Sequence, residues 1–247
     1  KMNMFCYFVE PASYTLDLAE NIYKKNKIDY CFINSNTLAK SLSNSEKVFL
    51  DRLSIFSKLY FLISTFNRND FIIVNGYNNY VFFVTFMLNL LSVNKKYIAV
   101  ESDTQLSVPR NLIKRIVKRF YLSTIFRSKY ILGFAGGGTI HKDLFRHYGM
   151  QEERIFLMPM MVDNQKYYAE PKIFPEVFSF LFVGRLIETK NVEKLCDRFL
   201  YHFSDKNVKL TIVGDGEDLD RLKTDYSHPN ISFRGSVFNE DLVSLYR

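Results

Sequence analysis

The sequence lacks the residue patterns that hold metal ions or disulfide bridges. Its three cysteines, Cys6, Cys31 and Cys196, are far apart, lie in apolar stretches and form no Cys-x-x-Cys pair. Such cysteines indicate buried free thiols in a reducing compartment. The four histidines show no metal-ligand spacing either. We therefore expect a functional site that uses no metal ion.

Segments for export or membrane insertion are also missing. Residues 1–30 show no charged start followed by an apolar run and a small-residue cleavage site. The longest apolar run, Tyr80 to Val93, is interrupted by Thr85 and Asn89 and is shorter than the roughly 20 residues that a membrane span needs. This run predicts a buried helix, and the protein is expected to be cytoplasmic.

The motifs of several enzyme classes are absent. The sequence has no serine-hydrolase elbow and no Walker motif. Glu10-Pro-Ala-Ser follows the first predicted strand without a glycine, which disfavours a Rossmann dehydrogenase. Gly136-Gly-Gly138 fits neither glycine-rich phosphate motif, so we interpret it as a flexible strand-to-helix turn that could also line a cleft.

What is present is the composition of a folded globular protein. The chain has 247 residues, of which 47% are hydrophobic and 24% charged, enough for one large or two modest domains. Its net charge of +7 favours anionic partners. Nucleotide phosphates, acidic lipid head groups and nucleic acid all remain open at this point.

Strand-like and helical patterns alternate along the first part of the chain, which is typical of βαβ units around a parallel sheet. Predicted strands are Met4–Val9, Tyr30–Ile33, Phe71–Asn75, Tyr97–Glu101 and Tyr130–Ala135. Predicted helices are Leu16–Lys25, Arg52–Phe66, Tyr77–Leu91, Pro109–Ser123 and Thr139–Tyr148. Several strands are apolar on both faces, as in a sheet covered on both sides.

A second α/β series follows a looser, proline-containing segment at 155–175. It predicts strands Phe178–Val183, Val208–Val213 and Ile231–Arg234 and helices Asn191–Tyr201, Leu219–Tyr226 and Asp241–Tyr246. The predicted fold class is α/β with two Rossmann-like domains, residues 1–165 and 176–247, the second incomplete.

Three motifs of this second series occur in order: Phe182-Val-Gly-Arg-Leu-Ile-Glu-Thr-Lys190, Leu210-Thr-Ile-Val-Gly-Asp-Gly216 and Ile231-Ser-Phe-Arg-Gly235. Together they resemble family-4 (group 1) glycosyltransferases, the retaining enzymes of the GT-B fold. Glu152 to Asp163 looks like the segment that ends the family's first domain, with Met160-Met161 where Asn-Gly is usual. The loop Glu10–Tyr14 lacks the paired glycines of many members.

The resemblance implies transfer of a sugar from a nucleotide-diphosphate sugar to a glycan or lipid-linked acceptor, with retention, in surface polysaccharide or glycolipid synthesis. It implies no cofactor, no metal and no nucleic-acid partner. In such enzymes the donor phosphate oxygen is thought to take the acceptor proton, so a dedicated base need not exist. The second predicted domain ends before the family's Glu-x7-Glu motif, so weak or absent turnover is expected of this polypeptide.

Physical chemistry supports a donor diphosphate at the first motif. Gly184 lets the backbone approach a ligand, Arg185 offers a planar fork for phosphate oxygens, and Lys190 stands near a helix start. A helix N-terminus adds unpaired N–H groups and a positive dipole end. The family resemblance assigns the same roles to Arg185 and Lys190. Alternatively, both are ordinary solvated charges in a loop.

Two further strand ends carry candidate residues. Asp215 and Gly216 follow the second strand of this domain, and Val237 follows the third, where resembling enzymes border the nucleotide; the alternative for Asp215 is a helix cap. In the first domain, Glu101 and Asp103 end a strand at the place where resembling enzymes put a polar residue beside the transferred sugar. Alternatively, one of them caps the next segment and the other is solvated.

A basic amphipathic helix is the last candidate. Leu112, Ile113, Ile116, Val117 and Phe120 take one side of it. The basic residues are Arg110, Lys114, Arg115, Lys118 and Arg119. Either the apolar side packs into the core and the charges are solvated, or the basic side meets anionic lipid or a phosphorylated acceptor at the inner face of the cell membrane.

Two other functions stay open. One is a catalytically silent module that kept the fold and binds nucleotide or membrane. The other is a non-hydrolysing nucleotide-sugar epimerase, which the Gly-Arg-x4-Lys match disfavours.

Overall fold

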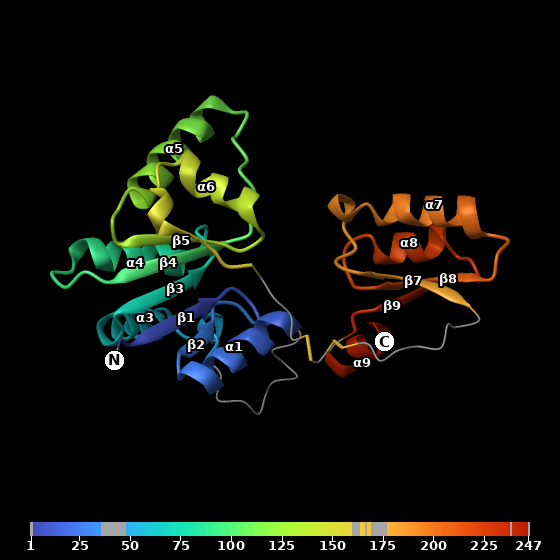
Figure 1. Ribbon diagram of the computed structural model, residues 1–247, viewed down its shortest axis with the longest axis horizontal. Coiled ribbons are helices and arrows are strands. Elements are labelled where there is room, and N and C mark those ends of the chain that lie inside the picture. Colours follow the sequence, from blue (N-terminus) through green and yellow to red (C-terminus); the bar gives the residue numbers. More distant parts are fainter. Residues whose placement is uncertain are drawn as a thin grey trace. The chain divides into compact units, whose positions relative to one another are not determined.

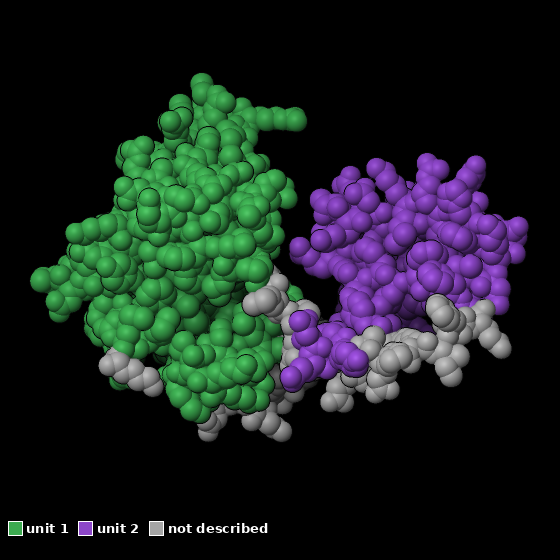
Figure 2. Space-filling model, in the orientation of Figure 1, with its two compact units in different colours: residues 1–162 green, residues 163–247 purple. Residues whose placement is uncertain are grey.

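The computed structural model describes residues 2–35, 48–159, 164–165, 167–168, 177–237 and 239–246. Met160 and Met161, which depart from the family pattern, lie outside these residues. The chain divides into two compact units, residues 1–162 and 163–247 (Figure 2). Each unit is an α/β structure with its own parallel sheet.

The first unit is built on a six-stranded sheet in the order β2-β1-β3-β4-β5-β6 (Figure 1). All neighbouring strands in it are parallel. The strands are β1 (Met4–Phe8), β2 (Asp29–Phe32), β3 (Phe71–Asn75), β4 (Tyr97–Ser102), β5 (Ile131–Ala135) and β6 (Ile155–Leu157). The order reverses between β1 and β3, and the carboxyl edge at such a reversal is where open α/β sheets bind ligands.

Helices cover the two faces of this sheet unequally. Helix α1 (Ser13–Asn26) packs with β1 and β2 in one core cluster. A larger cluster joins the strands to four other helices: α3 (Ile55–Arg68), α4 (Tyr80–Leu91), α5 (Leu112–Phe126) and α6 (Lys142–His147). Short 3-10 turns lie at η1 (Leu50–Arg52), η2 (Thr139–His141) and η3 (Glu152–Arg154).

Side-chain caps set the starts of three helices, each about three residues later than predicted. Ser54 accepts a hydrogen bond from the Ser57 amide before α3, and Asn79 and Asn111 cap α4 and α5 in the same way. These oxygens satisfy helical N–H groups that have no partner within the helix. The helix predicted over Thr139–Tyr148 is instead η2 followed by α6.

Two other predictions for the first unit are wrong. Ile155–Leu157 does not belong to a loose interdomain segment, because it pairs with β5 as the sheet's last strand. Helix α4 is not fully buried: Val81, Phe82 and Phe86 are in the core, whereas the other side of the helix is exposed. In the described part of the chain, every helix is too short or too polar to cross a bilayer.

The second unit has three parallel strands, β7 (Phe178–Val183), β8 (Val208–Val213) and β9 (Ile231–Gly235), in that order. A 3-10 turn, η4 (Glu188–Lys190), follows β7 and leads into α7 (Val192–Phe203). Helices α8 (Leu219–Asp225) and α9 (Asn239–Tyr246) complete the described part. Side chains of α7 and α8 form the core with β8 and β9, which brings the loops after β7 and β8 to one edge.

Candidate functional site

Backbone hydrogen bonds hold the loops after β7 and β8 against each other in the second unit. The amide of Leu186 donates to the carbonyl of Asp215 at 2.9 Å, and the amide of Asp218 donates to the carbonyl of Leu186 at 3.1 Å. The end of β9 joins them, because the Gly214 amide donates to the Gly235 carbonyl at 2.8 Å. All three predicted motifs therefore meet at the carboxyl edge of this sheet.

Glycines make this close contact possible. A Cβ on Gly214 would lie 1.8 Å from the Gly184 carbonyl oxygen, and one on Gly216 would lie 2.2 Å from the Leu186 oxygen. Both glycines also have positive φ, 143° and 157°. From the sequence, Gly184 was expected to allow close approach of a ligand and Gly216 to border the nucleotide. In the structure, the first role of Gly214 and Gly216 is to let two loops touch.

The predicted diphosphate residues lie in this assembly. Arg185 is exposed in the loop after β7, and Lys190 is exposed at the end of η4. Within the described residues, neither side chain has a hydrogen bond or ion pair. Asn191, in a left-handed conformation, precedes α7 without capping it through its side chain. Two cations and an open helix N-terminus thus follow β7 within a few residues, and each can donate hydrogen bonds to the oxygens of an anion.

The remaining candidates of this unit fall on the same edge. The Asp215 carboxylate accepts a hydrogen bond from the Gly216 amide at 2.8 Å, so it stiffens its own loop. It does not cap α8, whose N-cap position is Asp218, and that alternative is wrong. Val237 is half-buried two residues after β9.

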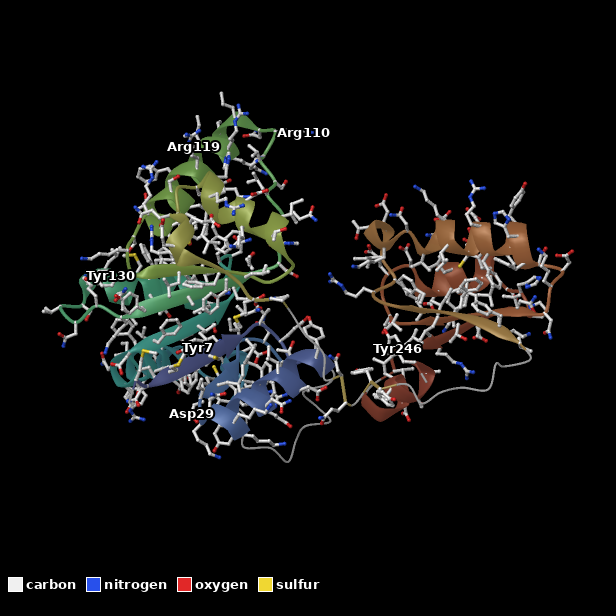
Figure 3. All side chains as sticks on the ribbon, in the orientation of Figure 1. Tyr7, Asp29, Arg110, Arg119, Tyr130 and Tyr246 are labelled. Atoms are coloured by element: carbon white, nitrogen blue, oxygen red, sulfur yellow. The ribbon has the colours of Figure 1, made fainter. Side chains whose placement is uncertain are left out.

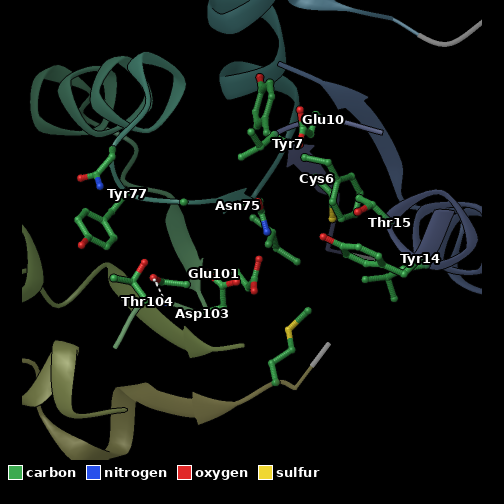
Figure 4. A pocket seen from close by; sticks show the side chains of 18 of the residues that line it. Cys6, Tyr7, Glu10, Tyr14, Thr15, Asn75, Tyr77, Glu101, Asp103 and Thr104 are labelled. Carbon is green, nitrogen blue, oxygen red and sulfur yellow. Dashed lines mark hydrogen bonds between the residues drawn. The ribbon is translucent and has the colours of Figure 1, made fainter. Parts of the chain in front are cut away.

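The first unit contains a cavity of about 360 Å³ at the reversal of its strand order. Residues at the carboxyl ends of three strands line it, among them Glu10 after β1, Asn75 of β3 and Glu101 of β4. Helix α1 contributes Tyr14, and Tyr77 lies across the cavity from it (Figure 4). Asn75, Tyr14 and Tyr77 were not predicted. The sequence did offer a signal for Asn75, because this residue ends a strand at the edge where such sheets bind ligands.

Glu101 is the most perturbed carboxyl group of this cavity. It is only 7% exposed, and in the described part of the chain its carboxyl group has no hydrogen bond or ion pair. Burial, and then the negative charge of Asp103, raises the pKa of Glu101 to about 7. Near neutral pH the group therefore exchanges between a proton donor and an anion.

The surroundings of Glu101 exclude the alternative in which it or Asp103 caps the next segment. Neither Glu101 nor Asp103 caps the next segment, because the Ser102 hydroxyl accepts the Thr104 amide at 3.2 Å. Asp103 is exposed. Gly136, the first residue of the glycine turn after β5, packs against the Glu101 carboxyl group. Both predicted carboxylates, Glu101 and Asp103, thus line the cavity, and the glycine turn after β5 packs against Glu101.

The basic amphipathic helix is α5, and its apolar side is not in the core. The first half of the helix is exposed on all sides; Ile113 is 72% and Phe120 is 77% exposed. Only Leu122, Ile125 and Phe126 of α5 are buried. The alternative in which the apolar side packs into the core is therefore wrong.

The basic residues of this region take the other side of α5 and the turn before it. Figure 3 shows Arg110 and Arg119 projecting outward from the region of α5, away from the sheet. Lys114 and Arg115 are exposed. Lys118 is half-buried and donates to the Ser107 carbonyl at 3.0 Å.

Among the described residues, no cluster of three or more His, Cys, Asp or Glu could hold a metal ion. This leaves the metal-free site a prediction. The candidate groups are the cations of the second unit and the carboxylates of the first.

One protein-family model matches the second unit. Residues 177–247 match the family described as glycosyl transferases group 1, which confirms the resemblance drawn from the three motifs. No curated protein matches the chain.

Solved structures share the fold across nearly the whole chain. HepE from Anabaena, in complex with UDP-glucose, has a TM-score of 0.68 at 14% identity over 99% of this chain and 71% of its own. WaaG, a glycosyltransferase involved in lipopolysaccharide biosynthesis, has a TM-score of 0.60 at 12% identity over 98% of this chain and 72% of its own. The GT-B fold class predicted from the sequence is thereby confirmed.

The same fold occurs in proteins of another activity. A putative UDP-N-acetylglucosamine 2-epimerase from Listeria monocytogenes has a TM-score of 0.55 at 8% identity, over 98% of this chain and 71% of its own. The fold alone therefore does not separate a transferase from an epimerase. The group 1 match of residues 177–247 favours the transferase.

Proposed function

We propose that the protein transfers a sugar, with retention, from a nucleotide-diphosphate sugar to a glycan or lipid-linked acceptor in surface polysaccharide or glycolipid synthesis. The observation that carries this proposal is the arrangement of loops at the carboxyl edge of the sheet in the second unit. There, three loops that match group 1 glycosyltransferases are joined by hydrogen bonds, with Arg185 and Lys190 exposed beside them.

The donor diphosphate is the group that best fits Arg185 and Lys190. As the glycosidic bond to the donor breaks, negative charge grows on the leaving diphosphate, and fixed cations stabilise it. The open N-terminus of α7 adds backbone N–H groups. We propose that these groups neutralise the diphosphate without a metal ion. UDP is the first nucleotide to test, because HepE was solved with UDP-glucose.

On the acceptor side, we propose that the transferred sugar approaches the Glu101 cavity. Near pH 7 the carboxyl group of Glu101 can donate a hydrogen bond to a sugar hydroxyl when protonated and accept one when ionised. Asp103 is the second carboxylate of this cavity. In the retaining route implied by the family resemblance, the acceptor hydroxyl attacks the sugar, the bond to the diphosphate breaks, and a phosphate oxygen takes the proton. Glu101 then positions the sugar and need not be the base.

We also propose that the first unit rests on an anionic membrane. Residues 52–142 contain 13 Lys and Arg against three Asp and Glu, whereas the rest of the chain contains 20 against 23. The same region exposes apolar side chains on α3, α4 and α5, among them Phe56, Leu91 and Phe120. Apolar side chains within a basic surface match an acidic bilayer interface, where a lipid-linked acceptor would be found.

A second candidate function is a catalytically silent module that binds membrane only. The exposed apolar side of α5 favours it, because membrane contact requires nothing of the second unit. The two candidates differ at Arg185 and Lys190, which only a donor-binding protein needs.

Titration of the protein with UDP and GDP tests the donor site. We expect Arg185→Ala and Lys190→Ala each to weaken binding of the preferred nucleotide at least tenfold, the effect of losing a charge-assisted phosphate contact. Arg198→Ala is the matched control, because Arg198 is an exposed cation within α7, away from its N-terminus. Equal affinity of the parent, both site variants and the control would refute the transferase proposal.

A further inference from the structure

The Glu101 cavity has two chemically different ends. One end is apolar and lies between α1 and the sheet, where Leu18 and Ile22 of α1 face Cys6, Phe8 and Ile73 of the strands. The other end is polar and lies at the carboxyl ends of the strands, as described above. A ligand that fills the cavity therefore needs an apolar part and a hydrogen-bonding part next to each other.

The polar end carries charge of one sign. Three carboxylates line the cavity, Glu10, Glu101 and Asp103, and the lining described by the structure includes no Lys, Arg or His. This is the reverse of the surface of the same unit, where basic residues dominate from 52 to 142. A phosphate or carboxylate that entered the cavity would meet repulsion from these carboxylates and no compensating cation among the described lining residues. At pH 8, above the raised pKa of Glu101, this group is also an anion, and because it is only 7% exposed its repulsion is poorly screened.

Hydroxyl groups, in contrast, suit this end of the cavity. Carboxylate oxygens accept hydrogen bonds from hydroxyls, and the Asn75 amide can both donate and accept. Figure 4 shows the side chains of Asn75 and Glu101 between the rings of Tyr14 and Tyr77. Tyr14 is 42% exposed, and an aromatic ring at this end favours a ligand that is itself a ring with apolar C–H surfaces.

We propose that this cavity selects the acceptor: it binds an uncharged, hydroxyl-bearing sugar ring that carries an apolar substituent, and it rejects an acceptor with a phosphate or carboxylate on that ring. The inference rests on the proposed function for the identity of the ligand as an acceptor. For a lipid-linked acceptor, it places any phosphate group outside the cavity.

Binding of small glycosides to the full chain tests this selection. Phenyl β-glucoside, phenyl β-galactoside and phenyl N-acetyl-β-glucosaminide supply an uncharged ring with an apolar substituent. Phenyl β-glucuronide adds a carboxylate, and the three methyl β-glycosides remove the apolar group. We expect at least one phenyl glycoside to bind tenfold or more tightly than phenyl β-glucuronide and than its own methyl analogue, as measured by calorimetric titration.

Two variants locate the effect within the cavity. At pH 8, where Glu101 is ionised, Glu101→Gln keeps the size of the side chain and removes its charge, so the discrimination against phenyl β-glucuronide should fall at least threefold. Glu153→Gln, at an exposed position of η3, is the matched control. Leu18→Asn places a polar group at the apolar end of the cavity, so it should abolish the tighter binding of phenyl glycosides over their methyl analogues. Ile113→Asn, on the exposed side of α5, should leave that difference in affinity unchanged. The Ile113 variant excludes binding to the apolar surface of that helix.

The outcomes separate this inference from the donor site. If no phenyl glycoside binds, or if phenyl β-glucuronide binds as tightly as the uncharged glycosides, the acceptor inference is overturned. The UDP titration with Arg185→Ala is independent of that result. Glycoside binding without any nucleotide binding would instead leave the cavity a glycoside site and refute the transferase proposal.

Discussion

Gly136 leaves open the space that the carboxyl group of Glu101 occupies. A Cβ on Gly136 would lie 2.2 Å from Oε1 of Glu101, far closer than atoms can approach. The amide of Gly136 also donates to the carbonyl of Ser102 at 2.9 Å, which fixes the glycine turn beside the end of β4. A larger residue than glycine at position 136 would therefore clash with the carboxyl group of Glu101 on the neighbouring strand β4.

The first prediction concerns this pair. Gly136→Ala should lower the free energy of unfolding by about 1–3 kcal/mol, the usual cost of overpacking a buried site. In the Glu101→Ala background the same substitution should cost clearly less, because the clashing group is gone. A double-mutant cycle from urea unfolding, followed by circular dichroism, measures the coupling. Additive effects of the two substitutions would show that the two residues do not share this space.

The second prediction is a pH dependence. Because the pKa of Glu101 is raised to about 7 in the folded protein from 4.5, the folded state holds this proton more tightly than the unfolded state. Its contribution to stability is full below pH 4.5 and is lost as the pH rises through about 7. This difference in pKa corresponds to a contribution on the order of 3 kcal/mol.

Glu101→Gln isolates this contribution, since glutamine resembles the protonated acid at every pH. Relative to the variant, the parent should lose stability between pH 4.5 and pH 8, as measured by urea unfolding at several pH values. Other titrating groups cancel in the difference. Parallel stability curves for parent and variant would contradict the raised pKa.

The strands were largely predictable from the sequence because the signal is local. Phe71–Asn75, Phe178–Val183 and Val208–Val213 were predicted with the observed ends, since each is a short run in which apolar residues dominate. Strand β6 was missed because it has three residues, two of them half exposed. The late starts of α3, α4 and α5 were readable in principle from Ser54, Asn79 and Asn111, whose side chains cap them.

The candidate sites were less predictable, because they depend on what covers a residue. The periodicity of α5 shows which side is apolar but not whether anything packs on it, and the structure leaves Ile113 and Phe120 exposed. The burial of Glu101 depends on Gly136, which is 35 positions away in sequence and adjacent only through the pairing of β4 and β5. The roles of Gly214 and Gly216 likewise follow from a loop beyond their own strand.

The third prediction concerns those two glycines. Gly214→Ala and Gly216→Ala should each separate the loops after β7 and β8 and weaken UDP binding at least tenfold. Gly138→Ala is the control: its φ of 131° also disfavours alanine, but nothing lies within 4 Å of the new Cβ, and the residue belongs to the first unit. It should destabilise the protein slightly and keep UDP affinity within about threefold. Nucleotide binding that survives in the Gly214 and Gly216 variants would show that loop contact is not needed for the site.

The fourth prediction concerns the membrane surface of the first unit. The parent should float with vesicles containing anionic phosphatidylglycerol and not with pure phosphatidylcholine, and salt should weaken the binding because it screens surface charge. Lys114→Glu combined with Arg115→Glu should weaken it at least tenfold, given about 1 kcal/mol for each basic residue near an anionic bilayer. Phe120→Ser should weaken it by removing apolar insertion.

Tyr201→Ser is the matched control, because Tyr201 is also about 76% exposed but lies on α7 of the second unit. If the Phe120 and Tyr201 variants bind vesicles equally well, α5 is not the contact, and the exposed sides of α3 and α4 would have to account for any binding.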